Sequence, residues 1–497
     1  MHLSRRQALT SLAGAGALTL AGCLSGSDAD DTLEVALHWN YLDSLDPAVD
    51  LDAGIQLFEP LVDVTADANF EPALATSWEP TDDTTWTFDL DSEATFHDGD
   101  PVTAEDVVWS LERSFDASAN LAAVPFESVE ELDDERVAIN TTEPFAPMLA
   151  YLTRVDAAII SRASIEDGDV VEPIGTGPFE FEAWEPGDSL TVSRFDDYHG
   201  REPSVERVVY NVVTDNQTRS FRLENGDAEI AHRLPASSLE TLEADDDLEP
   251  HVHETYSVRF LVFNTTSPPF DDRRVRQAVS YATDRSAIVD LLEGIPTAAT
   301  DGPIPPSLDR WAAGDVDGYS HDPERAEALL DESDWDDDRE VKLWTYTAHE
   351  FDRLAEAIQQ QLAAVGFDID IRVTEYQPLG EAKEAGEFDF SMESWSSNMG
   401  GDIDTMIRYF HSSDTDLSSG YDNERIDDLV MEGRQTLDPS ERREIYAEIQ
   451  RTVTEDAPLC YLTYNSHLHG SRASVDGYDP QPPRNMDLTG VEYRPQD

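Results

Sequence analysis

The sequence has 497 residues, enough for two or three domains, and 39% of them are hydrophobic, enough for a sizeable core. It carries 33 Lys and Arg against 105 Asp and Glu, a formal net charge of −72. This charge argues against a nucleic-acid partner, because contacts to phosphates need cations. The acidic residues are spread along the whole chain, which predicts a surface adapted to high salt, with a receptor for cationic ligands as the alternative.

The first 22 residues have the character of an export signal. A basic stretch at 4–7 precedes an uncharged apolar stretch that is too short to span a bilayer. Its paired arginines resemble a twin-arginine signal, and the Leu-Ala-Gly-Cys sequence that ends at Cys23 resembles a lipobox. We therefore expect a signal peptide over residues 1–22, a lipid on Cys23 and a polar tether over residues 23–32, with an ordinary cleaved signal as the alternative.

Cys460 is the only other cysteine. It lies in an apolar run, which predicts a buried core thiol rather than a nucleophile. If Cys23 carries lipid, no disulfide can form within the chain. No segment after the signal is apolar enough to cross a membrane, so we expect a soluble protein held outside the cell by its N-terminus.

The patterns along the chain predict a mixed α and β protein. Residues 33–37 and 86–90 alternate as strands, and residues 207–213 read as a buried strand. Thr103 is a helix N-cap, with Asp106 three positions later and an apolar stripe after it. These signals alternate between the two-residue period of strands and the longer period of helices.

The clearest unit is a strand–helix–strand sequence. A strand at 341–345 is followed by a helix at 354–365, by Gly366 as its stop, and by a second strand at 367–373. A crossover of helical length predicts two parallel strands in one sheet. Two further helices are expected to begin at the Asp-Pro pairs 322–323 and 438–439.

No enzyme motif stands out. The chain has no G-x-S-x-G elbow, H-E-x-x-H pair or phosphate-binding loop. Gly175-Thr-Gly-Pro has two glycines but no following lysine, which favours a structural turn. Phe96-His-Asp-Gly places an imidazole beside a carboxylate, and Asp-Gly favours a turn there as well. No catalytic residue is therefore predicted, and no cofactor.

Two pairs of histidines offer the best case for a metal. His251 and His253, like His467 and His469, are two positions apart, so each pair faces one side if it lies in a strand. Imidazoles at this spacing suit a transition metal. Solvated strand histidines are the alternative, and we predict no metal site from the pattern alone.

Five stretches together resemble one family. "ATFHDGDPVTAEDVVWSLER" at 94–113 resembles the signature of the family 5 extracellular solute-binding proteins, which are dipeptide, oligopeptide and nickel receptors of ABC importers. Matching stretches follow in the family's order at 174–179, 269–289, 323–333 and 356–371. The resemblance covers essentially the whole mature chain, and the acidic composition together with the lipobox is typical of a haloarchaeal lipoprotein.

The resemblance implies an α/β fold of the periplasmic-binding-protein type. Two lobes meet at a cleft, and the chain crosses between them twice, here at 255–263 and 459–464. The expected units are lobe I at 33–72, 175–260 and 466–497, a subdomain inserted into lobe I at 73–174, and lobe II at 261–465.

It also implies a receptor rather than an enzyme. A peptide-like or oligosaccharide-like solute enters the cleft, the lobes close over it, and the closed receptor docks on a membrane permease with its ATPase subunits. The expected form is a monomer on the extracellular face of the membrane. A nickel or metal-chelate receptor on the same fold, using the histidine pairs, and a surface hydrolase remain the alternatives.

The stretch Trp395-Ser-Ser-Asn-Met-Gly-Gly-Asp402 resembles the ligand loop of lobe II. In peptide-binding members, the loop after this Trp carries an Asp that pairs with the amino terminus of the peptide; here the matching residue is Asn398. An amide lacks the charge that makes such a bond strong, so a free α-amino group on the solute is in doubt. The predicted ligand-binding residues are Trp395, Asn398, Asp402, Asn40, Tyr41, Tyr256 and Tyr464.

Overall fold

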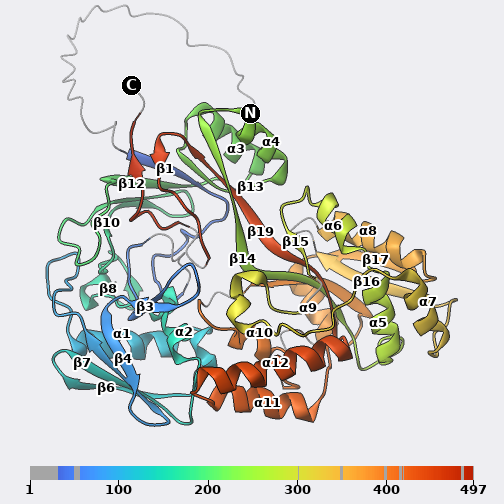
Figure 1. Cartoon of the computed structure of the whole chain (residues 1–497). Helices are drawn as coiled ribbons and strands as arrows, with labels where there is room; N and C mark the ends of the chain where they lie inside the picture. The colour runs from blue at the N-terminus through green and yellow to red at the C-terminus, as the bar shows by residue number, and fades with distance from the viewer. Residues whose placement is uncertain are drawn as a thin grey trace, which may run out of the picture.

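The computed structural model describes residues 32–49, 56–299, 302–346, 351–396, 400–413, 417, 419–482 and 486–495. The predicted signal peptide, Cys23 and Asn398 lie outside the described residues. One large sheet passes through the molecule from lobe to lobe (Figure 1). In order across it, the strands are β10 (Phe179–Glu185), β11 (Ser189–Arg194), β12 (Arg207–Val212), β1 (Thr32–Leu37), β13 (Ile230–Leu234), β19 (Leu459–Arg472), β14 (Leu248–Phe263), β18 (Phe390–Ser396), β16 (Glu340–Tyr346) and β17 (Asp368–Thr374), with β15 (Thr297–Ala298) beside β19.

Strands β14 and β19 are common to both lobes. They pair antiparallel from Leu248 opposite Arg472 to Val262 opposite Leu459, and the register shifts between Glu254 and Val258. Figure 1 shows the two strands running together through the middle of the molecule. The two predicted crossings lie within these strands. We keep the names lobe I, inserted subdomain and lobe II for the predicted ranges, whose boundaries stay a prediction.

The inserted subdomain has a sheet of its own. Its strand order is β4 (Ala75–Pro80), β5 (Thr85–Leu90), β7 (Arg136–Thr141) and β6 (Phe126–Asp133). Helix α1 (Ala104–Ala117) packs on it, and the predicted N-cap is confirmed: Thr103 accepts from the Asp106 amide while Asp106 accepts from the Thr103 amide. The short hairpins are β2 (Val62–Val64) with β3 (Phe70–Pro72), β8 (Ile165–Glu166) with β9 (Asp169–Val170), and β20 (Val475–Asp476) with β21 (Glu492–Tyr493).

The predicted strand–helix–strand unit is confirmed. Helix α8 (Phe351–Ala363) joins β16 to β17, which pair in parallel. Gly366 ends the connection with a φ of +98°, in the left-handed region that favours glycine. The other helices are α2 (Met148–Leu152), α3 (Asn216–Asn225), α4 (Leu239–Ala244), α5 (Arg273–Ala282), α6 (Arg285–Leu291), α7 (Pro323–Asp331), α8 (Phe351–Ala363), α9 (Tyr376–Glu384), α10 (Asp404–Arg408), α11 (Glu424–Gln435) and α12 (Pro439–Asp456).

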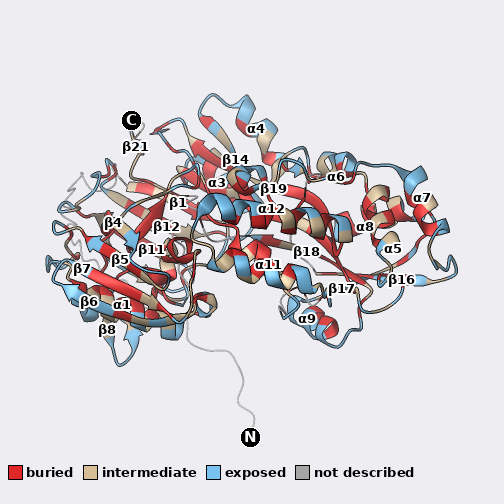
Figure 2. Ribbon diagram, turned by 60° about the horizontal axis from the view of Figure 1, so that its bottom comes forward, coloured by how far each residue is buried: buried red, intermediate tan, exposed pale blue. Residues whose placement is uncertain are grey.

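Each part of the molecule has its own hydrophobic core. Among the described residues, buried side chains form one large and two small clusters in lobe I, one cluster centred on the inserted subdomain and two in lobe II. Figure 2 shows buried strands between helices whose outer faces are exposed. Cys460 is buried, as predicted. Within the described residues, no helix has the length and apolarity needed to span a bilayer.

Candidate functional site

A cavity of about 600 Å³ opens beside the crossing strand β14, where lobe I faces lobe II. Lobe I contributes residues 250–254 of β14, the turn of the β2–β3 hairpin and a Pro-rich segment near the C-terminus. Lobe II contributes the 3₁₀ helix η6 (Pro306–Trp311). The lining residues are Ala66, Asp67, Pro250, His251, Val252, His253, Glu254, Pro306, Ser307, Asp309, Asp479, Pro480, Gln481 and Pro482.

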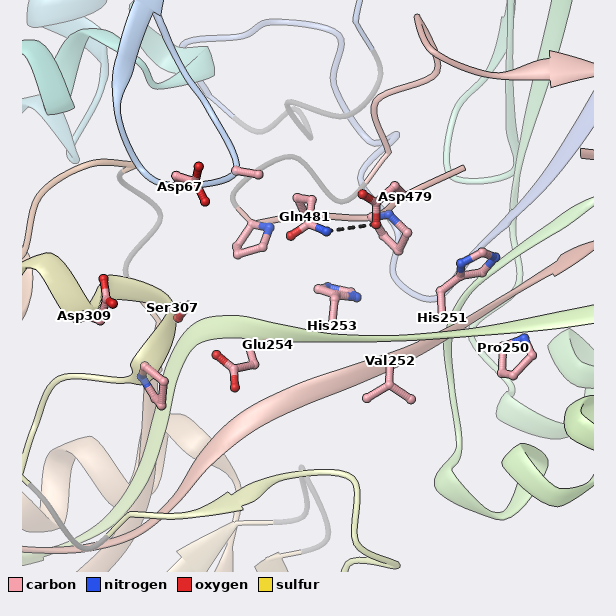
Figure 3. Close-up of a pocket in the computed structure, with 14 residues that line it drawn as sticks. Asp67, Pro250, His251, Val252, His253, Glu254, Ser307, Asp309, Asp479 and Gln481 are labelled. Atoms are coloured by element: carbon pink, nitrogen blue, oxygen red, sulfur yellow. Dashed lines mark hydrogen bonds between the residues drawn. The ribbon is translucent and has the colours of Figure 1, made fainter. Parts of the chain in front are cut away.

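The lining is polar and rich in acids and imidazoles. Figure 3 shows His251 and His253 projecting from β14 toward Asp479 and Gln481, as the two-residue period of a strand requires. Gln481 donates to Asp479 at 2.9 Å. Neither Lys nor Arg lines the cavity within the part of the chain that the structure describes. The cavity thus offers acceptors and imidazoles to a solute.

The two histidine pairs meet across the strand pair. His251 stands opposite His469 and His253 opposite His467, and the His253 ring lies 4.7 Å from that of His469. His232 of β13 joins them, 4.1 Å from His469 between ring centres. Of the two pairs, only His251 and His253 line the cavity (Figure 3). The sequence predicted each pair, but the meeting of the pairs depends on strand register.

The other three histidines, His232, His467 and His469, are neutral. Burial above all, and then neighbouring histidines and Arg233, lowers the pKa of His232, His467 and His469 well below the usual value of 6.5. The Nε2 atoms of His232 and His469 have no hydrogen-bond partner. Among the described residues, no group of three or more histidine, cysteine or acidic side chains is arranged to hold a metal ion.

Comparison with known proteins supports the resemblance found in the sequence. Residues 69–416 match the profile described as bacterial extracellular solute-binding proteins, family 5 middle, which is more than half of the chain. This chain belongs to the family 5 extracellular solute-binding proteins.

Several known proteins are similar to this chain in sequence or in fold. The chain is 27% identical to the probable D,D-dipeptide-binding periplasmic protein DdpA of Escherichia coli, over 88% of this chain and 89% of that protein. Its fold matches DppA of Helicobacter pylori in complex with the peptide STSA, with a TM-score of 0.78, 23% identity and coverage of 94% and 98%. It also matches NikA of Staphylococcus aureus in complex with Ni(L-His)2, with a TM-score of 0.77, 22% identity and coverage of 93% and 99%.

Trp395 of this family 5 protein lies at the end of β18 and faces the lobe II core. It is 7% exposed, and its ring stacks on Tyr409 at 5.0 Å and tilts against Phe260 at 4.6 Å. Its Nε1 has no hydrogen-bond partner. The ring therefore anchors the start of the predicted ligand loop, and direct contact with solute stays a prediction.

Asp402, at the other end of this loop, is 2% exposed and is held by Arg442 of α12. Burial opposes the charge of Arg442, but the Asp402 carboxylate more than offsets it and raises the pKa of the guanidinium. Gly401, just before Asp402, accepts from the Trp311 indole at 3.0 Å. The structure therefore gives Asp402 an anchoring contact, and its predicted role in binding is untested.

The loop reaches lobe I through its glycines. A Cβ on Gly400 would lie 2.3 Å from Val64, and one on Gly401 would lie 2.7 Å from Phe70. Gly401 also has a φ of +77°. The hairpin that carries Val64 and Phe70 lines the cavity at its turn. The end of the predicted ligand loop thus packs against an element of the cavity wall.

Asn40 and Tyr41 lie just after β1, on the lobe I side. Asn40 accepts from the Leu42 amide at 3.0 Å, which fixes a local turn. The Tyr41 hydroxyl lies 3.3 Å from Nε2 of His38, whose Nδ1 is 3.1 Å from that of His232. Neither predicted residue lines the cavity, and their contact with solute stays a prediction.

Tyr256 and Tyr464 are both buried core aromatics on the crossing strands. The Tyr256 hydroxyl donates to the carbonyl of Pro482, a residue of the cavity wall, at 3.2 Å. The Tyr464 hydroxyl donates to the carbonyl of Gly302 within lobe II at 2.9 Å. The Tyr256 hydroxyl therefore holds one residue of the cavity wall in place.

The family signature itself is structural. His97 accepts from the Gly175 amide at 3.2 Å through Nδ1 and donates to the Gly177 carbonyl at 3.0 Å through Nε2. Burial lowers the pKa of His97 to about 4, so the imidazole stays neutral. Gly99 has a φ of +87°. The predicted turn at Phe96-His-Asp-Gly is confirmed, and His97 joins it to the Gly175-Thr-Gly-Pro segment.

Sequence reasoning missed six polar residues of the cavity wall: Asp67, Glu254 and four residues in two Pro-rich segments. Ser307 and Asp309 belong to η6, and Asp479 and Gln481 lie near the C-terminus. In a chain with 105 acidic residues, an acid in a loop carries no signal of its own. The shared Pro-rich composition of these segments was the one available sign, since rigid loops often carry binding residues.

Proposed function

We propose that this protein is the receptor of an ABC importer and captures a peptide-like solute in the cavity beside β14. One observation carries the proposal: residues of both lobes line the cavity, which lies next to β14 and β19, the only two strands of the described large sheet that belong to both lobes. Rotation about β14 and β19 brings η6 toward or away from Asp67 and Gln481. A solute that contacts both walls stabilises closure by the difference of its affinity for the closed and open forms.

The rest of the cycle follows from the proposed location. The twin-arginine-like signal exports the chain, and a lipid on Cys23 holds the monomer at the extracellular face of the membrane. The tether over residues 23–32 keeps it near its permease, and the ATPase subunits supply the energy. The protein itself makes and breaks no bond. The charge of −72 keeps the receptor soluble in a high-salt exterior.

Native mass spectrometry of protein purified in high salt tests the solute class. A retained mass equal to a short peptide supports the proposal. A retained hexose oligomer would instead identify an oligosaccharide receptor.

The charge at position 398 sharpens the test. Asn398→Asp restores the carboxylate found in peptide-binding members, so we expect a gain of about tenfold in affinity for dipeptides with a free α-amine over N-acetylated ones, measured by titration calorimetry. Asn225→Asp adds the same charge on the surface of lobe I and is the control. Equal gains in both variants would show general electrostatics rather than a loop that meets the solute.

A metal chelate is the second candidate solute. His251 and His253 line the cavity, yet no three described side chains are placed to hold a bare ion. A metal that arrives with its own ligands needs only one or two imidazoles from the protein. Titration with the nickel–histidine complex should then release heat that His253→Gln abolishes and His321→Gln, in lobe II, does not. Absence of heat in the unmodified protein removes this candidate.

A further inference from the structure

The end of α11 in lobe II docks on the inserted subdomain. The Ala146 amide donates to the Arg434 carbonyl at 2.7 Å, and Arg434 Nη2 donates to the Ala123 carbonyl at 2.7 Å. The Arg434 guanidinium also lies 5.1 Å above the Phe145 ring. Leu437, just beyond α11, packs on the hydrophobic cluster of the inserted subdomain. Polar and apolar contacts therefore join the two parts on the α2 side of the molecule (Figure 1).

Asp404 lies at the centre of this junction. It begins α10 and is 0% exposed. Its Oδ2 accepts from the Tyr151 hydroxyl of α2 at 3.1 Å, and its Oδ1 forms an ion pair with Arg434 Nε at 3.1 Å, outside hydrogen-bond alignment. Burial first, and then the Asp404 carboxylate, raises the pKa of Tyr151 far above its usual value, so the phenol stays a donor. The Asp404–Arg434 pair belongs to lobe II, and Tyr151 reaches it from the inserted subdomain.

The same segment holds the predicted ligand loop. Only one residue separates Asp404 from Asp402, which Arg442 holds, and the Asp404 amide donates to the Asp402 carboxylate at 2.8 Å. Asp402, at the end of the predicted ligand loop, lies two positions before Asp404, the carboxylate that Tyr151 and Arg434 contact from the two parts of the molecule. The contact between the two parts therefore lies next to the end of this loop.

We infer that Tyr151 is a positioning residue for solute capture: its hydroxyl fixes Asp404, and with it the adjacent residues Gly400–Asp402, when the lobes are closed. This inference rests on the proposed function, because it assigns the junction to the closed form. In the open form, water replaces the Tyr151 hydroxyl on Asp404, while Arg434 stays paired with the carboxylate. A hydrogen bond from one neutral donor to a carboxylate is strong enough to favour the closed form and weak enough to break when the lobes open.

Hydrogen exchange of the solute-free protein tests the junction. In Tyr151→Phe the Ala146 amide should exchange about tenfold faster, with no change in β1 or β16. Tyr319→Phe is the matched control, since it removes a buried hydroxyl bond of 2.8 Å to the Thr454 carbonyl within lobe II. It should leave Ala146 unchanged. An unaltered Ala146 in Tyr151→Phe, or faster exchange throughout the molecule, would overturn the inference.

Small-angle scattering tests the assignment to closure. Tyr151→Phe should increase the radius of gyration of the solute-free protein, because the open form gains population, whereas Tyr319→Phe should not. An unchanged radius would show that the junction is permanent and would also overturn the inference. Hydrogen exchange and scattering are both measured without solute. A failure to find a peptide in the cavity would therefore contradict the proposed function without changing the result of either experiment.

Discussion

The strand pair β14–β19 has two halves of opposite character. In lobe II, residues such as Phe260 and Tyr461 pack in an apolar cluster with Trp395. In lobe I the same strands carry His253 and His469 among other imidazoles. The register shift between Glu254 and Val258 separates the halves. Apolar burial stabilises the lobe II half, and this contribution does not depend on pH. The stability of the lobe I half does depend on pH, because its imidazoles are neutral in the folded state.

The largest expected effect comes from the apolar half. Phe260→Ala removes a 1% exposed ring and should lower the free energy of unfolding of lobe II by about 3–5 kcal/mol. Val252→Ala, at a 48% exposed position of the same strand in lobe I, should change it by no more than about 0.5 kcal/mol. Denaturant titration in high salt compares them, and similar losses would show that the halves do not differ in this way.

Acid should act on the other half. The pKa values of His232, His467 and His469 are lowered in the folded state, so the unfolded chain binds more protons just below pH 6.5. Stability is then fully present above pH 6.5 and falls as the pH drops below it, by about 1.4 kcal/mol per pH unit for each histidine.

The slope of unfolding free energy against pH, between pH 6.5 and 5, measures this. His469→Gln should make the slope shallower by one proton, and His321→Gln in lobe II should not change it. An unaltered slope in His469→Gln would mean that the cluster accepts protons without unfolding.

Local patterns account for the elements that sequence reasoning predicted correctly. The cap at Thr103, the stop at Gly366 and the β16–α8–β17 unit each depend on residues within one turn or one strand period. Cys460 was predicted buried because its immediate neighbours are apolar. Such signals are complete within a few residues, so no knowledge of the rest of the fold was needed.

The candidate site depends on contacts between distant segments. Trp395 looked like the first residue of a loop, but pairing of β18 with β14 sets it against Phe260 in the core. Asp402 was predicted to bind ligand, and nothing in the local pattern indicated that Arg442, 40 residues later, binds its carboxylate. Each histidine pair was visible, while their meeting follows from the β14–β19 register. These partners are fixed by tertiary packing, which a local pattern does not contain.

The smallest effect tests the point where the two halves meet. Tyr256 and Tyr464 are both buried, and each donates one hydroxyl bond to a backbone carbonyl, so replacement of either by Phe should cost about 1 kcal/mol of stability. Their partners differ: Tyr256 holds Pro482 of the cavity wall, whereas Tyr464 holds Gly302 inside lobe II. Hydrogen exchange at Gln481 should therefore rise in Tyr256→Phe and stay unchanged in Tyr464→Phe. If both variants free Gln481 equally, the crossing strands act as one unit, and the cavity wall is held by the whole pair rather than by one hydroxyl.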